Sequence, residues 1–239
     1  MTVVFDLDGT TIFKGQKMSL EITQAIDKLS KERQVVFASA RPIRDMLPVL
    51  PDIFHDFDLI GGNGSFIRQN QQIKTKKFAE KQIKKIFSLI EEHELNYMAD
   101  SQWNYAYQGD VNHPLYLGID PNKQAKNIPL HTLEEIVKVV LFTTDEHIIN
   151  ELSELDIAIN FHGSEALIDL SPTNISKYSA YQALKIEGPF TMFGNDVNDL
   201  PMFEKCEKCY VVGDLVTDIP KSTNISLDEV SATILSLLK

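Results

Sequence analysis

The first eleven residues, MTVVFDLDGTT, constrain the fold more than any other part of the chain. An apolar run from Val3 to Phe5 is followed at once by Asp6 and Asp8, with one residue between them. Alternate side chains of an extended segment point the same way, so we expect both carboxylates to project together from the end of a buried strand. Like charges this close are costly unless a cation or a proton lies between them. The pattern therefore predicts a divalent metal and, beside it, a carboxylate that is free for chemistry.

Short apolar strands alternate with helices at both ends of the chain. Residues 20–29 are predicted to form a helix, because their apolar side chains recur at helical spacing and Ser19 can cap the start. The segments that we interpret as strands are 34–38, 57–60, 190–193 and 210–212. Continuous apolar strands separated by helices are typical of a parallel sheet covered on both faces. We therefore expect an α/β core.

The middle of the chain has a different pattern. A helix is predicted from about Ala79 to Leu95, and strand-like segments and a second helix follow in mixed order. This order favours antiparallel pairing and an α+β arrangement. We therefore predict a second, inserted domain at residues 80–172, and a discontinuous core domain made of residues 1–79 and 173–239.

Composition narrows the possible partners. The net charge of −11 argues against binding to nucleic acid or to an anionic membrane surface, and no apolar run is long enough to span a membrane. The N-terminus does not resemble a signal peptide, because two acids follow only four residues of strand and no basic segment precedes them. We expect a cytoplasmic protein with neither a nucleic-acid nor a membrane partner, and the residues do not predict its oligomeric state.

The two cysteines of the sequence, Cys206 and Cys209, form a CxxC pair. Such a pair can bind zinc, but a zinc site needs two more ligands, and no paired His or Cys motif lies nearby. It can also be a redox pair, which usually stands at the start of a helix after a strand. Here it lies between a helix-like segment, residues 200–205, and an apolar strand. We therefore interpret the pair as two ordinary thiols at the end of a helix.

The sequence resembles the haloacid dehalogenase-like hydrolases, most of which are Mg²⁺-dependent phosphatases. DxDGT at the end of an N-terminal apolar strand is the first motif of that family, and it is far more specific than a lone DxD. Ser39 in VVFASAR matches the second motif, Lys177 in NISKYSAYQAL the third, and FGNDVNDLPMF at 193–203 the fourth. IGGNGSFI at 60–67 resembles a turn of the Cof-type branch. That branch carries a type IIB cap inserted after the third strand. The resemblance covers essentially the whole chain and implies a Rossmann-like parallel-sheet core with an inserted α+β cap domain.

The resemblance also implies roles for the matched residues, which follow strands whose carboxyl ends are the usual ligand site of open α/β sheets. Asp6 is expected to attack phosphorus and to carry a transient aspartyl phosphate, and Asp8 to act as general acid and then as general base. Ser39 is expected to bind a phosphate oxygen, although a turn or helix-cap role is open as well. Lys177 is expected to bind the phosphate and to balance the charge of the nucleophile Asp6 and of the phosphate, although a lysine in a first helical turn is usually only solvated. Arg41 either aids substrate binding or pairs with a surface acid.

The fourth motif departs from the family pattern, because Asn195 stands where the family usually has an aspartate. Mg²⁺ takes oxygen ligands in octahedral geometry and keeps several waters. Either Asn195 provides its amide oxygen, or a shifted turn offers Asp196. Aligned on the motif, the metal ligands are expected to be Asp6, Asp8, Asn195 and Asp199, the last as a supporting carboxylate that can act through water. An amide removes one negative charge from the site, so we expect weaker metal affinity.

These observations predict a Mg²⁺-dependent phosphatase that acts on a small phosphorylated metabolite, such as a sugar phosphate, a flavin mononucleotide or pyridoxal phosphate. The inserted cap is expected to close over the site, exclude water and set substrate choice. A phosphotransferase of the phosphomutase kind is an alternative, because relatives with this cap type include such enzymes. A phospholigand-binding protein without activity is a third possibility. The joint presence of Asp6, Asp8, Ser39 and Lys177 argues against the last.

Overall fold

The computed structural model describes residues 1–162, 166–217 and 219–238, and the chain divides into two compact units. The core unit comprises Met1–Ile73 and Ser176–Lys239. The insert unit comprises Lys74–Ile175. The core unit is therefore assembled from two stretches of sequence that a long insertion separates.

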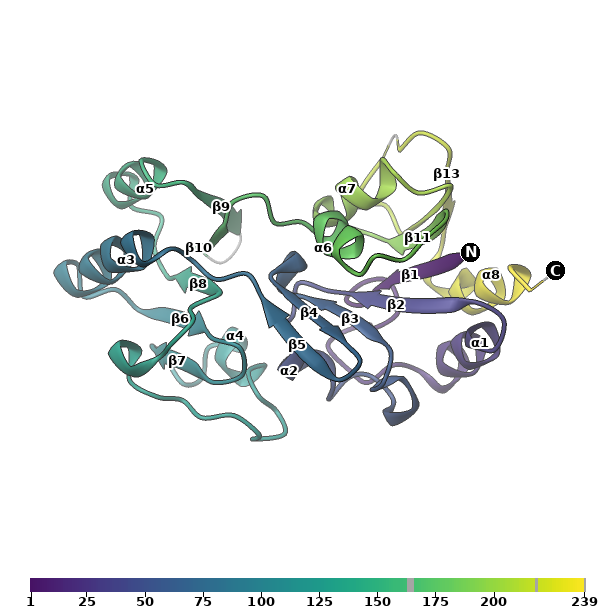
Figure 1. The fold of residues 1–239 in the computed structure, drawn as a ribbon, viewed down its shortest axis with the longest axis horizontal. Helices are drawn as coiled ribbons and strands as arrows, with labels where there is room; N and C mark the ends of the chain where they lie inside the picture. The colour runs from purple at the N-terminus through teal and green to yellow at the C-terminus, as the bar shows by residue number, and fades with distance from the viewer. Residues whose placement is uncertain (163–165, 218, 239) are drawn as a thin grey trace. The chain divides into compact units, whose positions relative to one another are not determined.

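The core unit is built on a mainly parallel sheet (Figure 1). Its strands, in spatial order, are β13 (Ser222–Ile225), β12 (Lys208–Val212), β11 (Phe190–Gly194), β1 (Thr2–Asp6), β2 (Gln34–Ala38), β3 (Asp58–Gly61), β4 (Phe66–Gln69) and β5 (Gln72–Thr75). Pairing is parallel from β13 to β3, and β4 runs antiparallel to β3. The predicted α/β, Rossmann-like core is confirmed. The expectation of parallel strands alone was incomplete, because β4 turns back through a short glycine-rich turn at the edge.

Helices cover both faces of this sheet (Figure 1). They are α1 (Leu20–Ser30), α2 (Ile43–Met46), α6 (Lys177–Ala183), α7 (Leu200–Phe203) and α8 (Val230–Ser236). The side chain of Ser19 accepts a hydrogen bond from the amide of Ile22 and so caps α1, as predicted. Helix α1 packs against α8, while α6 and α7 bury their apolar residues against Val4 and Val36 on the other face. Alternate residues of β1 and β2 are therefore buried on opposite faces of the sheet, and each face packs against its own layer of helices.

A row of aromatic side chains crosses the three central strands of the sheet. The register pairs Phe5 of β1 with Phe193 of β11 and with Phe37 of β2. The ring centroids lie 4.9 Å and 6.1 Å from Phe5, respectively, within the range in which aromatic pairs attract. A slip of one residue would turn every one of these side chains to the opposite face. The row therefore holds the three strands so that they end at the same edge.

The insert unit has its own antiparallel sheet. Its strands, in spatial order, are β7 (Tyr105–Gln108), β6 (Tyr97–Asp100), β8 (Lys138–Leu141), β10 (Leu167–Pro172) and β9 (Ile157–His162). Helices α3 (Glu80–Glu92) and α5 (Glu146–Ser153) pack on one face, where Val139 and Leu141 are buried with them. The other face carries Val140, with the short helix α4 (Pro114–Leu117) beside it. Alternation along β8 therefore supplies two apolar layers from one strand.

The two cysteines do not remain free thiols, and that prediction was wrong. Cys206 follows α7 and Cys209 lies in β12, and the structure joins them by a disulfide. The turn from helix to strand brings their Cα atoms to 6.2 Å, within the span that a disulfide can bridge. Whether the two cysteines pair depends on the local path of the chain, which cannot be read from the CxxC spacing alone.

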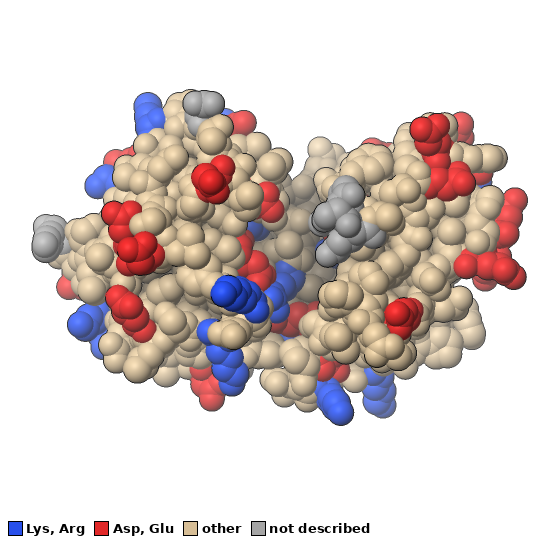
Figure 2. Space-filling view, turned by 180° about the vertical axis from the view of Figure 1, so that it is seen from behind, with Lys and Arg blue, Asp and Glu red and all other residues tan. Residues whose placement is uncertain are grey.

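The surface reflects the acidic composition. On the face drawn in Figure 2, acidic side chains are dispersed over the surface and basic ones form no extended band across its described residues. With a net charge of −11, an anionic ligand needs positive charge close at hand. In the described part of the chain, none of the helices is both long and apolar enough to cross a membrane.

Gly64, in the short 3₁₀ turn Gly62–Gly64 between β3 and β4, is under a double constraint. Its φ of +109° suits glycine, and a Cβ there would lie 2.2 Å from the backbone oxygen of Ser176. We expect Gly64→Ala to lower the free energy of unfolding by at least about 2 kcal/mol, because backbone strain adds to the collision. Urea unfolding followed by circular dichroism measures the loss.

The matched control for this substitution is Gly15→Ala. Gly15 also has a positive φ, +66°, but a Cβ there meets nothing within 4 Å. It should lose only the conformational part, about 1 kcal/mol. Equal losses at the two positions would contradict the packing argument for Gly64.

Candidate active site

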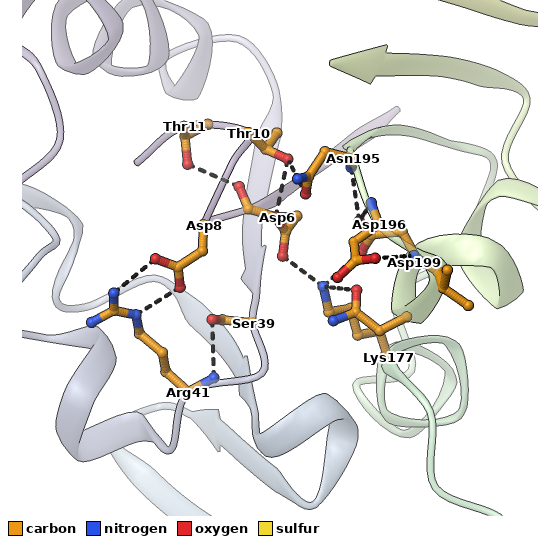
Figure 3. Close-up of polar contacts among 12 residues, drawn as sticks. Asp6, Asp8, Thr10, Thr11, Ser39, Arg41, Lys177, Asn195, Asp196 and Asp199 are labelled. Atoms are coloured by element: carbon orange, nitrogen blue, oxygen red, sulfur yellow. Dashed lines mark hydrogen bonds and ion pairs between the residues drawn. The ribbon is translucent and has the colours of Figure 1, made fainter. Parts of the chain in front are cut away.

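Polar residues meet where the central strands end (Figure 3). Asp6 is the last residue of β1 and pairs in register with Ala38, so Ser39 begins just beyond the neighbouring strand. Asn195 directly follows the last residue of β11 on the other side. The parallel register thus brings Asp6, Ser39 and Asn195 to one edge of the sheet, as the sequence predicted from the strand ends.

Lys177 is a fully buried charge in this site. It is the first residue of α6, whose start is capped by the side chain of Ser176, and none of its surface is exposed. Its Nζ donates to Asp6 Oδ1 at 2.6 Å, to Asp199 Oδ1 at 2.7 Å and to Asn198 Oδ1 at 3.0 Å. The alternative of a merely solvated lysine is therefore wrong. A cation at a helix start opposes the helix dipole, and the two carboxylates compensate for that.

The shared lysine leaves the Asp6 carboxylate only partly neutralised. The pKa of Asp6 is raised from its ordinary 3.8 to about 7, because the effect of burial, with a smaller contribution from the nearby Asp199, outweighs the lowering by Lys177. Burial by itself would lower the pKa of Lys177, but Asp6 and Asp199 outweigh it and hold that pKa above its ordinary value. Lys177 therefore stays charged, while further positive charge beside Asp6 would favour its ionised form.

Asp199 holds the turn that carries Asn195. One oxygen of its carboxylate accepts from Lys177, and the other accepts the backbone N–H groups of Asn195 at 2.9 Å and Asp196 at 3.2 Å. The side chain of Asp199 is fully buried. Its predicted role as a metal ligand stays a prediction, and both of its oxygens already have protein partners.

The side-chain amide of Asn195 lies against the first motif. One of its two terminal atoms is 3.1 Å from Asp6 Oδ2, 3.0 Å from the backbone oxygen of Asp8 and 3.1 Å from Thr10 Oγ1. Figure 3 draws the oxygen there, accepting from Thr10. Hydrogen bonding favours the opposite orientation, in which nitrogen faces the carboxylate and the carbonyl and donates to them. An oxygen in that place would meet two further oxygens with no proton between them.

Asp8 and Arg41 form a bidentate ion pair (Figure 3), in which both side chains are partly exposed. Arg41 Nε donates to Asp8 Oδ2 and a terminal nitrogen of Arg41 donates to Asp8 Oδ1, both at 2.7 Å. These bonds raise the pKa of Arg41. The hydroxyl oxygen of Ser39 accepts the backbone N–H of Arg41 at 3.1 Å, which is the turn role foreseen for it. The sequence left two roles open for Arg41, substrate binding or pairing with a surface acid, and it did not predict Asp8 as the partner.

Two threonines that we did not single out complete the first motif. Thr10 Oγ1 donates to Asp6 Oδ2 at 3.0 Å, and Thr11 Oγ1 donates to the backbone oxygen of Asp6 at 2.8 Å. Both side chains are fully buried. Their position directly after DxDG is the signal that could have identified them, because a buried hydroxyl needs a partner.

Asp196 joins the cluster through its backbone, which bonds to Asp199, and in the described part of the chain no hydrogen bond links its side chain to Asp6, Asp8 or Lys177. Its side chain is exposed, and one carboxylate oxygen accepts the N–H of Val197 at 2.6 Å. Of the two candidates that the sequence left open in the fourth motif, the structure brings Asn195, and not Asp196, against Asp6 and Asp8.

The donor set fits a Mg²⁺ ion on one condition. Among the described residues, no three His, Cys, Asp or Glu side chains group as metal ligands. The available oxygens are instead those of the Asp6 carboxylate, the Asp8 backbone carbonyl and the Asn195 amide. Bonds of 2.0–2.1 Å in an octahedron put neighbouring ligand oxygens about 2.9 Å apart, close to the 3.0 Å and 3.1 Å from the inner amide atom. The set fits if Asn195 turns its oxygen inward.

Comparison with known proteins gives one family and one fold. A sequence model of haloacid dehalogenase-like hydrolases matches residues 3–228. A Thermotoga maritima protein has a similar structure, with a TM-score of 0.82 and 21% identity over 100% of this chain and 97% of that one. A HAD subclass IIB sugar phosphatase has a TM-score of 0.76 and 15% identity over 99% and 98% of the two chains. A HAD-superfamily phosphatase from Bacteroides thetaiotaomicron has a TM-score of 0.73 and 16% identity over 100% and 94%. Among curated proteins, none matches this sequence.

The buried lysine makes a prediction about stability. In Lys177→Met a flexible apolar chain replaces the ammonium, and the carboxylates of Asp6 and Asp199 are left buried without their cation. We expect the free energy of unfolding to fall by about 3–5 kcal/mol, as when one partner of a buried pair is removed. Urea unfolding at neutral pH, in chelator, measures it.

Lys31→Met is the control for this change. Lys31 pairs with Asp27 at a similar distance, 2.8 Å, but its side chain is 67% exposed, and exposed pairs contribute little. If Lys177→Met cost no more than Lys31→Met, the lysine at 177 would not be compensating the two buried carboxylates.

Proposed function

Because this chain belongs to the haloacid dehalogenase-like hydrolase family, we propose that it is a Mg²⁺-dependent phosphatase that works through an aspartyl phosphate on Asp6. The observation that carries the proposal is the buried Asp6 carboxylate held by Lys177 and Thr10 at the end of β1. Such a carboxylate has a fixed direction of attack and a fixed cation beside it, which phosphoryl transfer requires.

In the first half of the proposed reaction, an oxygen of Asp6 attacks the phosphorus of the substrate. The bond from phosphorus to the leaving oxygen breaks as the new bond to Asp6 forms. Asp8, once it has left Arg41 and taken up a proton from solvent, gives that proton to the leaving oxygen, so that an alcohol departs. Lys177, whose Nζ lies 2.6 Å from Asp6 Oδ1, would offset the negative charge of the phosphoryl group beside Asp6.

In the second half, a water molecule attacks the phosphorus of the aspartyl phosphate. Asp8 takes the proton of that water, the bond to Asp6 breaks, and inorganic phosphate and the free carboxylate result. For both proton transfers the bidentate ion pair between Asp8 and Arg41 must first break. Arg41, freed from Asp8, is then a cation available to a phosphate oxygen.

Charge neutralisation comes from several groups at this edge of the sheet. Ser39 is proposed to hold a phosphate oxygen through its hydroxyl, and Lys177 provides a permanent positive charge. Mg²⁺, held by Asp6, the Asp8 carbonyl and Asn195, would supply a Lewis acid that neutralises phosphate charge. This accounts for how an acidic protein could accept a phosphorylated anion.

We propose that the substrate is a small phosphorylated metabolite, with a sugar phosphate as the first candidate. Support comes from a neighbour of the same fold that is described as a sugar phosphatase. At 15% identity that likeness shows the fold and not the substrate. The assignment of residues 80–172 as a cap that sets substrate choice stays a prediction.

Phosphate release tests the proposed function directly. Wild-type protein is assayed on a panel of sugar phosphates, flavin mononucleotide and pyridoxal phosphate, with Mg²⁺ and with chelator. We expect Mg²⁺-dependent release that Asp6→Asn reduces by at least about 1,000-fold, because the nucleophile is lost. Asp27→Asn, the same chemical change on the surface of α1, should leave release unchanged.

Two outcomes would count against hydrolysis. Release that persists in Asp6→Asn would point to another nucleophile or to a contaminant. No release by folded wild type would move the weight to the phosphotransferase, which is detected by adding a sugar acceptor and following transfer of labelled phosphate.

The fourth motif gives a second, independent prediction. We expect Asp196→Asn to keep at least half of the wild-type turnover at saturating Mg²⁺, because the Asp196 carboxylate is exposed and bonded to its own turn. Initial rates over a range of Mg²⁺ concentrations measure this. A large rise in the Mg²⁺ requirement of Asp196→Asn would show that Asp196, and not Asn195, completes the metal site.

A further inference from the structure

The backbone of Asn195 is fixed in position by a hydrogen bond to a buried carboxylate. Its main-chain N–H donates to the buried carboxylate of Asp199, and the whole residue is only 7% exposed. A Cβ built on Gly9 would lie 2.1 Å from the terminal atom of the Asn195 amide that does not face Asp6, so only glycine fits beside Asn195 in the turn after Asp8. The terminal amide of this side chain can still rotate by half a turn, which exchanges the positions of its nitrogen and its oxygen.

The inner atom of this amide faces the two oxygens that would face a metal. As nitrogen, it donates toward Asp6 Oδ2 and the Asp8 carbonyl, with Thr10 Oγ1 also within reach. From this geometry we propose that Asn195 is a built-in substitute for the cation. Without metal its N–H groups satisfy the ligand oxygens, and metal enters only when the amide turns its oxygen inward.

An aspartate in the same place would behave in the opposite way. Its inner oxygen would lie about as close to Asp6 Oδ2 and to the Asp8 carbonyl as the amide atom does, at 3.1 Å and 3.0 Å. Carboxylates at that separation repel unless a cation or proton intervenes. The metal-free site would therefore be unstable with aspartate, and metal binding would relieve the repulsion.

With asparagine the balance is reversed. The metal-free site already has its oxygens paired with N–H donors, and breaking those bonds sets a cost on metal entry. The amide oxygen also carries no full charge to attract the ion, and ligand charge is one of the quantities that sets cation affinity. This inference rests on the proposed function, which requires a metal at this site. It adds that the metal binds only when the amide of Asn195 has turned its oxygen inward.

The test compares wild type, Asn195→Asp and Asn195→Leu, each in chelator and in MgCl₂ at matched ionic strength. Thermal unfolding midpoints are read by circular dichroism, and Mg²⁺ affinity by isothermal titration calorimetry. In chelator, Asn195→Asp should melt several degrees below wild type. In Mg²⁺ it should recover and bind the ion at least about tenfold more tightly, while the wild-type midpoint changes little.

Asn195→Leu separates the two parts of the inference. Leucine has a similar size but neither donates to the oxygens nor binds a metal, so this variant should melt below wild type and gain nothing from Mg²⁺. Far-UV spectra at low temperature establish that each variant is folded before melting. A variant that does not fold in chelator is refolded in Mg²⁺ and then dialysed, and irreversible unfolding of Asn195→Asp on metal removal counts as support.

Two results would overturn the inference. One is an Asn195→Asp variant as stable as wild type in chelator, and the other is equal Mg²⁺ affinity in wild type and Asn195→Asp. Phosphate release by the same wild-type preparation keeps the outcomes distinct. Wild type that hydrolyses phosphate esters in a Mg²⁺-dependent way while failing these tests overturns the inference alone, and absence of Mg²⁺ binding in both proteins overturns the inference together with the metal requirement of the proposed function.

Discussion

The buried ammonium of Lys177 is the interaction on which the rest of the site depends. It joins the end of β1, the start of α6 and the turn after β11, which are far apart in the sequence, through bonds to Asp6 and Asp199. Asp199 passes this constraint on, because its second oxygen fixes the backbone of Asn195. A charge can be buried at this depth only if oppositely charged partners surround it. The position of Asp6 and the position of the fourth motif are therefore set by the same cation.

The sheet register places these groups before any of their bonds form. The ring of Phe5 lies between those of Phe37 and Phe193 in register, so β1, β2 and β11 all end at one edge. The polar residues start there because a buried parallel strand tolerates no unpaired carboxylate within it. Packing of aromatic rings in the core thus supports the register that brings Asp6, Ser39 and Asn195 to one edge of the sheet.

Much of this could be predicted from the sequence, and the failures have physical reasons. The strand ends, and with them the meeting of Asp6, Ser39 and Asn195, follow from local apolar runs and from the order of the motifs. The pairing of Asp8 with Arg41 could not be predicted, because it depends on how the turn after β2 directs a long side chain. The strand β4 was missed, since its residues FIRQ mix apolar and polar types at the sheet edge. The motifs predicted that Lys177 and Asp199 would lie near Asp6, but the direct bond from Lys177 to Asp199 becomes visible only in the folded chain.

The asparagine of the fourth motif can be understood from the charge of the whole cluster. Three carboxylates, those of Asp6, Asp8 and Asp199, face two cations, Lys177 and Arg41. A fourth carboxylate at position 195 would strengthen the attraction for a metal ion, but it would also increase the repulsion felt by an incoming phosphate whenever the ion is absent. In a protein whose overall charge is −11, that repulsion adds to a field that is already unfavourable to anions. An amide at position 195 removes one negative charge at the point where a metal and a phosphate would meet, so weaker attraction for the metal and weaker repulsion of the phosphate are two consequences of one substitution.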